Sequence, residues 1–127
     1  MNANPNTPLF IQAMLKPGFY AYPVESCELI ETHISWVILT GQFAYKIKKP
    51  VNFGFLDFSS IEKRKFYCEE ELRLNRRLAP DIYLDVIPIT GTTDNRELNG
   101  SGDVIEYTVK MKQFPQEIEL DHVLDKG

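Results

Sequence analysis

One stretch, residues 43–50, restricts the fold of this chain more than any other. Aromatic and aliphatic side chains occupy positions 43, 45 and 47, whereas Ala44, Lys46 and Lys48 occupy the positions between them. This alternation is typical of a β-strand with one face against a core. Pro50 ends the pattern, because proline cannot donate a hydrogen bond to a neighbouring strand.

The rest of the chain predicts an α+β fold around this strand. We expect a five-stranded, mainly antiparallel sheet with one long helix packed on it. The strands are expected at residues 27–31, 36–40, 43–49, 83–90 and 104–114. The long helix is expected at residues 60–78, with apolar positions such as Leu74 and Leu78 facing the sheet.

The remaining segments divide the chain into three parts. Residues 1–22 are expected to be an extension with a short helix at 8–15, capped by Thr7 and docked by Phe10 and Met14. Residues 23–116 form the body, in which 91–103 is expected to be a polar loop. Residues 117–127 are expected to begin a further helix that links to another part of the protein.

Composition excludes several classes of function. The chain has 127 residues and a net charge of −4, which argues against nucleic acid as the main partner. No segment has the length of apolar residues that a membrane span needs, and no signal peptide is visible. Cys27 and Cys68 lack the spacing of metal ligands, so we expect no metal site in this chain and a reducing, cytoplasmic location.

The third strand carries the candidate binding site. Ala44 leaves room for a flat base, and Lys46 places an ammonium group where phosphates would follow. A lone lysine on a strand is more often an exposed surface charge. Two other segments favour the binding interpretation: an acidic helix and the turn before the second strand.

The helix offers three consecutive acids, residues 69–71. Because Glu71 lies one turn before Leu74, we expect it to face the sheet and pair with Lys46, although Glu70 remains an alternative. An ordinary surface pair with a neighbouring arginine would contribute little. A pair between helix and sheet would instead fix the position of the Lys46 ammonium.

The turn at residues 32–35 has two equally supported interpretations. The Thr32 and Ser35 hydroxyls, with neighbouring backbone N–H groups, could hold phosphate oxygens. They could equally satisfy the backbone of the turn itself. His33 is more often a turn residue than a catalyst.

These residues carry a resemblance to a known fold. The Phe-Ala-Tyr-Lys sequence at 43–46 and the segment at 71–80 resemble the N-terminal lobe of the protein-kinase-like fold, and more closely that of aminoglycoside-phosphotransferase-like proteins. Together with residues 31–37, 44–51, 54–58 and 68–80, they resemble uncharacterised bacterial proteins in which such a region precedes a P-loop ATP-binding domain.

The resemblance implies an ATP site. Lys46 would hold the α- and β-phosphates, Glu71 would anchor Lys46, and Thr32, His33 and Ser35 would form the turn over the phosphates. Lys112 and Phe114 would lie near the hinge that binds the adenine edge, with Ala44 beneath the base.

The resemblance also implies what this chain lacks. In such phosphotransferases the catalytic aspartate and the Mg²⁺ ligands lie in a second lobe, and this chain has no matching motif. We therefore expect no catalytic residue here, an unknown small-molecule acceptor, and self-association through the exposed lobe face. The alternatives are a nucleotide-binding pseudo-kinase module that regulates a P-loop ATPase, or a non-catalytic interaction domain.

Overall fold

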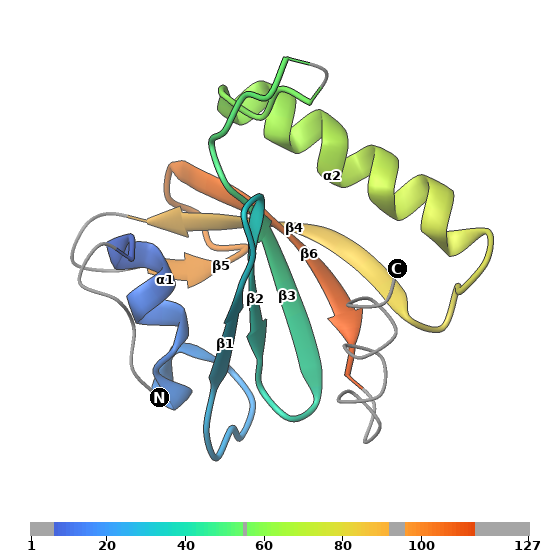
Figure 1. Cartoon of the computed structure of the whole chain (residues 1–127). Coiled ribbons are helices and arrows are strands. Elements are labelled where there is room, and N and C mark those ends of the chain that lie inside the picture. Colours follow the sequence, from blue (N-terminus) through green and yellow to red (C-terminus); the bar gives the residue numbers. More distant parts are fainter. Residues whose placement is uncertain (1–6, 55, 92–95, 114–127) are drawn as a thin grey trace.

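The computed structural model describes residues 7–54, 56–91 and 96–113. They form one antiparallel sheet with the strand order β1-β2-β3-β6-β4-β5 (Figure 1). The strands are β1 (Glu28–Glu31), β2 (Ser35–Leu39), β3 (Phe43–Lys48), β4 (Tyr83–Gly91), β5 (Arg96–Leu98) and β6 (Val104–Lys112). The helices are α1 (Leu9–Met14), a 3₁₀ turn η1 (Pro17–Phe19) and α2 (Ile61–Arg76).

The structure confirms the α+β class and the antiparallel sheet but adds a sixth strand. The strand β5 lies within residues 91–103, which the sequence predicted as a loop, and pairs with the end of β4. The Thr90 hydroxyl donates to the carbonyl of Glu97 and accepts from the N–H of Gly100, which holds the short hairpin together. The helix expected to begin within residues 117–127 and the strand end at Phe114 lie outside the described residues.

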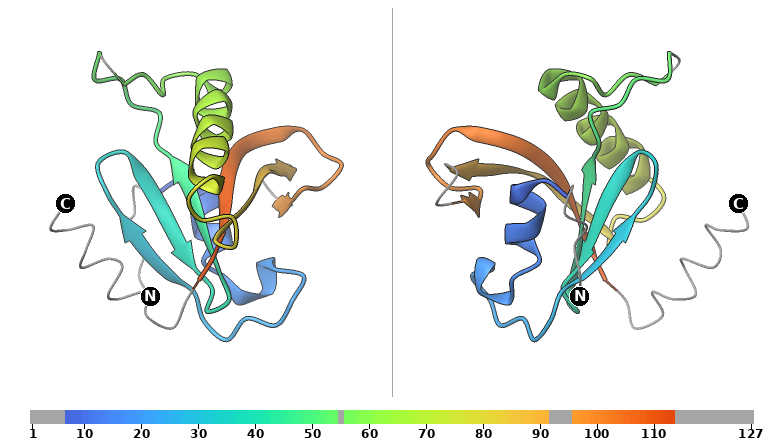
Figure 2. Two further views of the ribbon diagram at one scale, coloured as in Figure 1. Left: turned by 90° about the vertical axis from the view of Figure 1, so that its right-hand side faces the viewer. Right: turned by 60° about the vertical axis from the view of Figure 1, so that its left-hand side comes forward.

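Helix α1 covers one face of the sheet (Figure 2). Ile11 and Met14 are fully buried against Tyr45, Ile47 and Trp36. Tyr45 stacks on Tyr20, and the Tyr45 hydroxyl shares a hydrogen bond of 2.8 Å with Tyr22. This face is the aromatic core that the alternation in β3 predicted.

The start of α1 differs from the prediction. Pro8 occupies the N-cap position, and no side chain caps the helix. The Thr7 hydroxyl is buried without a hydrogen-bond partner among the described residues, so the predicted Thr7 cap is wrong. Docking of Phe10 is confirmed, since its ring meets Trp36 edge to face.

Helix α2 lies on the opposite face (Figure 1), and its sheet-facing stripe is polar. Ser60 caps it by accepting a hydrogen bond from the N–H of Lys63. Its buried residues are Arg64 and Cys68, and Glu71 continues the same helical stripe. Leu74 and Leu78 are 49% and 87% exposed, so the apolar face predicted from them is wrong.

A buried ion pair fixes the first half of α2. The Arg64 guanidinium lies 2.9 Å from Glu106 on β6 and also donates to the carbonyl of Phe58. Burial raises the pKa of Glu106 despite the Arg64 charge beside it. The second half of α2 is held by Arg76, which donates to the backbone carbonyls of Tyr83 and Leu84.

We predict that Arg64→Met lowers the free energy of unfolding by about 3–5 kcal/mol at neutral pH, because it leaves a buried carboxylate without its cation. The change raises the pKa of Glu106 further above its unfolded value. Stability is then regained as the pH falls toward about 4, below which Glu106 is protonated in both states. Chemical denaturation at several pH values measures this.

The matched control is Arg73→Met, which breaks the exposed pair with Glu70 on the same helix. Its unfolding midpoint should stay close to that of the unmodified chain. Equal losses for Arg64→Met and Arg73→Met would contradict the assignment of Arg64 to a buried supporting pair.

Candidate functional site

The face of the sheet that carries α2 contains two neighbouring rows of side chains on β2, β3 and β6. Directly opposed residues share a face, so Leu39, Ala44 and Met111 form one row. Val37, Lys46 and Val109 form the next, about 6.6 Å further along the strands. An apolar strip therefore leads directly to the ammonium group of Lys46.

The Glu71 carboxylate meets this face from α2. Its Oε2 atom lies 3.3 Å from Nζ of Lys46, so the predicted pair between strand and helix is present. Glu70 instead pairs with Arg73 on the exposed side of the helix, at 2.7 Å. The sequence correctly predicted Glu71 as the partner of Lys46. The argument for it was wrong, since Leu74 and Leu78 do not face the sheet.

A second lysine was missed by sequence reasoning. Nζ of Lys48 lies 2.6 Å from Oε1 of Glu71, closer than Lys46, and its side chain is only 7% exposed. The ammonium group also lies 5.2 Å from the centre of the Phe58 ring. A lysine near the end of a strand often protects a sheet edge, but β3 is an interior strand, so this role does not apply to Lys48.

The charges around Glu71 determine its protonation. Burial alone would raise the pKa of this carboxyl group, but the ammonium groups of Lys46 and Lys48 and their hydrogen bonds lower it below its ordinary value. Glu71 is therefore an anion at neutral pH, held between two cations.

The turn between β1 and β2 uses its hydroxyl groups internally. The Thr32 hydroxyl accepts from the N–H groups of Ile34 and Ser35 and shares a hydrogen bond of 3.0 Å with the Ser35 hydroxyl. Ser35 is buried. The structure therefore favours the interpretation in which these hydroxyls satisfy the turn, while His33 is exposed at its tip.

The expected base-binding end lies at the other end of β3. Lys112 pairs with Phe43, next to the pair of Ala44 and Met111. The backbone N–H of Lys112 donates to Ile82, so it belongs to the sheet rather than to a free hinge. An open groove of about 390 Å³ adjoins this end, and Leu39, Gln42 and Gln113 are among its lining residues. Phe114 lies outside the described residues.

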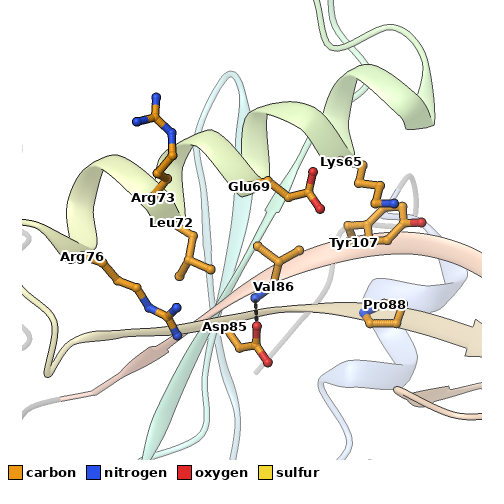
Figure 3. Close-up of a pocket in the computed structure, with 9 residues that line it drawn as sticks. All are labelled: Lys65, Glu69, Leu72, Arg73, Arg76, Asp85, Val86, Pro88 and Tyr107. Carbon is orange, nitrogen blue, oxygen red and sulfur yellow. Dashed lines mark hydrogen bonds between the residues drawn. The ribbon is translucent and has the colours of Figure 1, made fainter.

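A larger groove of about 540 Å³ lies along α2, β4 and β6 (Figure 3). Leu72 and Glu69 point from the helix into it, and Val86 lies opposite them. None of the nucleotide contacts expected from the sequence lines this groove. Val86 is directly opposite Val109, so the groove adjoins the end of the row that contains Lys46.

Cys68 lies in the interface between α2 and the sheet, close to these charges. It is fully buried, and burial raises the pKa of its thiol to about 12. Cys27 is also buried, and burial raises the pKa of its thiol as well. Neither thiol is ionised at neutral pH, so neither is a nucleophile in the folded chain.

The chain is similar to uncharacterised proteins of mycobacteria. One from Mycobacterium bovis and two from Mycobacterium tuberculosis are each 34% identical to it over 110 residues. The match covers 84% of this chain but only 20% of each relative, so the chain spans about a fifth of their length. No family model matches the chain, and no solved structure matches it.

Within residues 7–54, 56–91 and 96–113, no helix has the length and apolar character needed to cross a membrane. Nor do His, Cys, Asp and Glu residues there gather in a group of three that could hold a metal ion.

We predict that Cys27 and Cys68 resist alkylation by iodoacetamide in the native chain at about pH 8.5, where an unperturbed thiol is half ionised. Both should react fully once the chain is unfolded in denaturant. Mass spectrometry after timed quenching counts the modified thiols. Native labelling of Cys68 as fast as in denaturant would contradict its burial beneath α2.

Proposed function

We propose that this chain is the ATP-binding N-terminal lobe of a phosphotransferase of the protein-kinase-like fold, related to aminoglycoside-phosphotransferase-like enzymes. The observation that carries the proposal is the ion pair of Lys46 on β3 with Glu71 on α2. Protein kinases use a pair of this kind, between a strand lysine and a helix glutamate, to position nucleotide phosphates. The chain order of three strands, a long helix and further strands agrees with such a lobe.

The two rows on the sheet suit the two ends of ATP. The adenine would lie against the strip formed by Leu39, Ala44 and Met111, which is apolar and has a small central side chain. Leu39 and Ala44 are buried in the ligand-free chain, so the base would have to displace the groups that cover them. The phosphates would follow along β3 toward Lys46, whose side chain is 30% exposed and within reach of a ligand. Lys112, at the end of β6, would lie near the adenine edge.

The Mg²⁺ ion that accompanies ATP would neutralise phosphate charge and align the transferred group. The described residues of this chain offer no cluster of metal ligands, so we place those ligands in a second lobe. The chain would then contribute phosphate positioning, while the second lobe would bind an acceptor hydroxyl and supply the base. We expect no phosphate transfer by this chain alone.

A regulatory role is the alternative that the same pair permits. A pseudo-kinase module would keep Lys46 and Glu71 but lack the catalytic aspartate in the second lobe. Sequencing beyond residue 127 in the parent gene decides this, because a His-x-Asp-type segment favours the enzyme and its absence favours the regulator.

We predict that ATP shifts backbone NMR signals of β3 and β6 around Lys46 in the 127-residue chain. Lys46→Ala should weaken this response by about tenfold or more, since it removes the charge that contacts the phosphates. Lys49→Ala is the matched control, because Lys49 lies on the same segment and pairs with Glu31 instead.

An unchanged ATP response in Lys46→Ala, or an equal loss in both variants, would remove Lys46 from the site. Retained folding is checked by comparing the spectra of both variants without ATP.

We also predict that the chain self-associates through exposed apolar side chains of α2 and of the turn that follows it. Phe66, Leu74 and Leu78 are 55%, 49% and 87% exposed, which is unusual for large apolar residues of a lobe that stands alone. Sedimentation velocity at rising concentration should reveal dimers, and Leu74→Lys with Leu78→Lys should reduce them. A monomer at all concentrations would contradict this.

A further inference from the structure

The Glu71 carboxylate has two cationic partners that differ in exposure. Lys48 is closer, with its Nζ atom 2.6 Å from Oε1 of Glu71 and its side chain 7% exposed. Lys46 lies 3.3 Å from Oε2 and is 30% exposed. The two lysines alternate with Ile47 along β3, so both ammonium groups approach the helix from the same face.

Because the two lysines differ in burial, they differ in their ability to exchange Glu71 for a ligand. An ammonium group as buried as that of Lys48 needs a permanent anionic partner, because the cost of burying an unpaired charge is large. Among the described residues, Lys48 forms its ion pair with Glu71 and also lies over the face of the Phe58 ring. Lys46 is open to solvent and can exchange the carboxylate for a ligand.

The charge of the cluster follows from its members. Two ammonium groups and one carboxylate leave one positive charge. The neighbouring Arg64 and Glu106 neutralise each other, and the Cys68 thiol is protonated. A site with one lysine and one glutamate would be neutral, so an incoming phosphate would compete with the glutamate for the lysine.

We infer that Lys48 is the residue that neutralises Glu71, and that it thereby leaves the Lys46 ammonium as an uncompensated positive charge for a phosphate group. The identity of the ligand rests on the proposed function, whereas the pairing rests on the structure alone. Lys48 is a positioning residue, since it acts on the ligand through Glu71. Glu71 then orients Lys46 while its charge is balanced by Lys48.

The experiment compares the affinity of three variants of the 127-residue chain for ATP and for inorganic tripolyphosphate. Lys48→Met makes the cluster neutral and should weaken binding of both ligands by about tenfold, as expected for one charge close to a polyphosphate. The double variant Lys48→Met with Glu71→Gln regains one positive charge and should recover most of the original affinity.

Lys49→Met is the matched control, because it removes one charge from the same chain segment but breaks the pair with Glu31. It should leave binding within about twofold at moderate ionic strength, where distant charges are screened. If Lys48→Met unfolds the chain, the double variant still tests whether Lys48 neutralises Glu71, because the double variant buries no unpaired charge. Failure of the double variant to bind more tightly than a chain with a neutral cluster would overturn the inference.

A ligand-free measurement separates this inference from the proposed function. Carbon NMR of the Glu71 carboxyl group follows its pKa, which should rise more in Lys48→Met than in Lys46→Met. A larger rise in Lys46→Met would overturn the pairing. If the unmodified chain binds neither ATP nor tripolyphosphate, the proposed function is overturned, and this titration still decides whether Lys48 neutralises Glu71.

Discussion

The buried carboxylate of Glu71 is the contact on which the arrangement of helix and sheet around the site depends. It joins α2 to two lysines of β3, and the pair of Arg64 and Glu106 provides a second ionic contact further along the helix. A helix that packs through charged groups is held in one register, because a shift by one residue would bury unpaired charges. The polar interface therefore defines the position of α2 more narrowly than apolar packing would.

The two faces of the sheet have different roles. The face under α1 is an aromatic and aliphatic core in which Tyr45 and Ile47 are buried. The face under α2 carries the apolar strip of Leu39, Ala44 and Met111 and the charged cluster that follows it. Because side chains alternate along a strand, the single segment β3 contributes to both. Stability and the candidate site are thus encoded in alternate residues of one strand.

The sequence predicted the elements whose pattern is strong and local. Strand β3 and helix α2 have regular spacing and clear ends, and both are confirmed within a few residues. Strand β5 has three residues and no visible alternation, so nothing distinguished it from a loop. The sheet-facing stripe of α2 is polar, which reverses the usual rule for an amphipathic helix and misplaced Leu74 and Leu78.

The candidate site was predictable in part for the same reason. Lys46 and Glu71 belong to a recognisable pattern, whereas Lys48 resembles an ordinary charged residue near a strand end. The pairing of Lys48 with Glu71 depends on how α2 packs on the sheet, and the sequence pattern does not show this. The hydroxyls of Thr32 and Ser35 had two equal interpretations in the sequence, and their hydrogen bonds within the turn favour the structural one.

The most direct measurement is a crystal structure of the chain with a non-hydrolysable ATP analogue. The account predicts the adenine on the strip around Ala44, a phosphate group in contact with Lys46, and Glu71 still paired with Lys48. A nucleotide bound in the groove between α2 and β4, or a phosphate held by Lys48 with Glu71 paired only to Lys46, would contradict it.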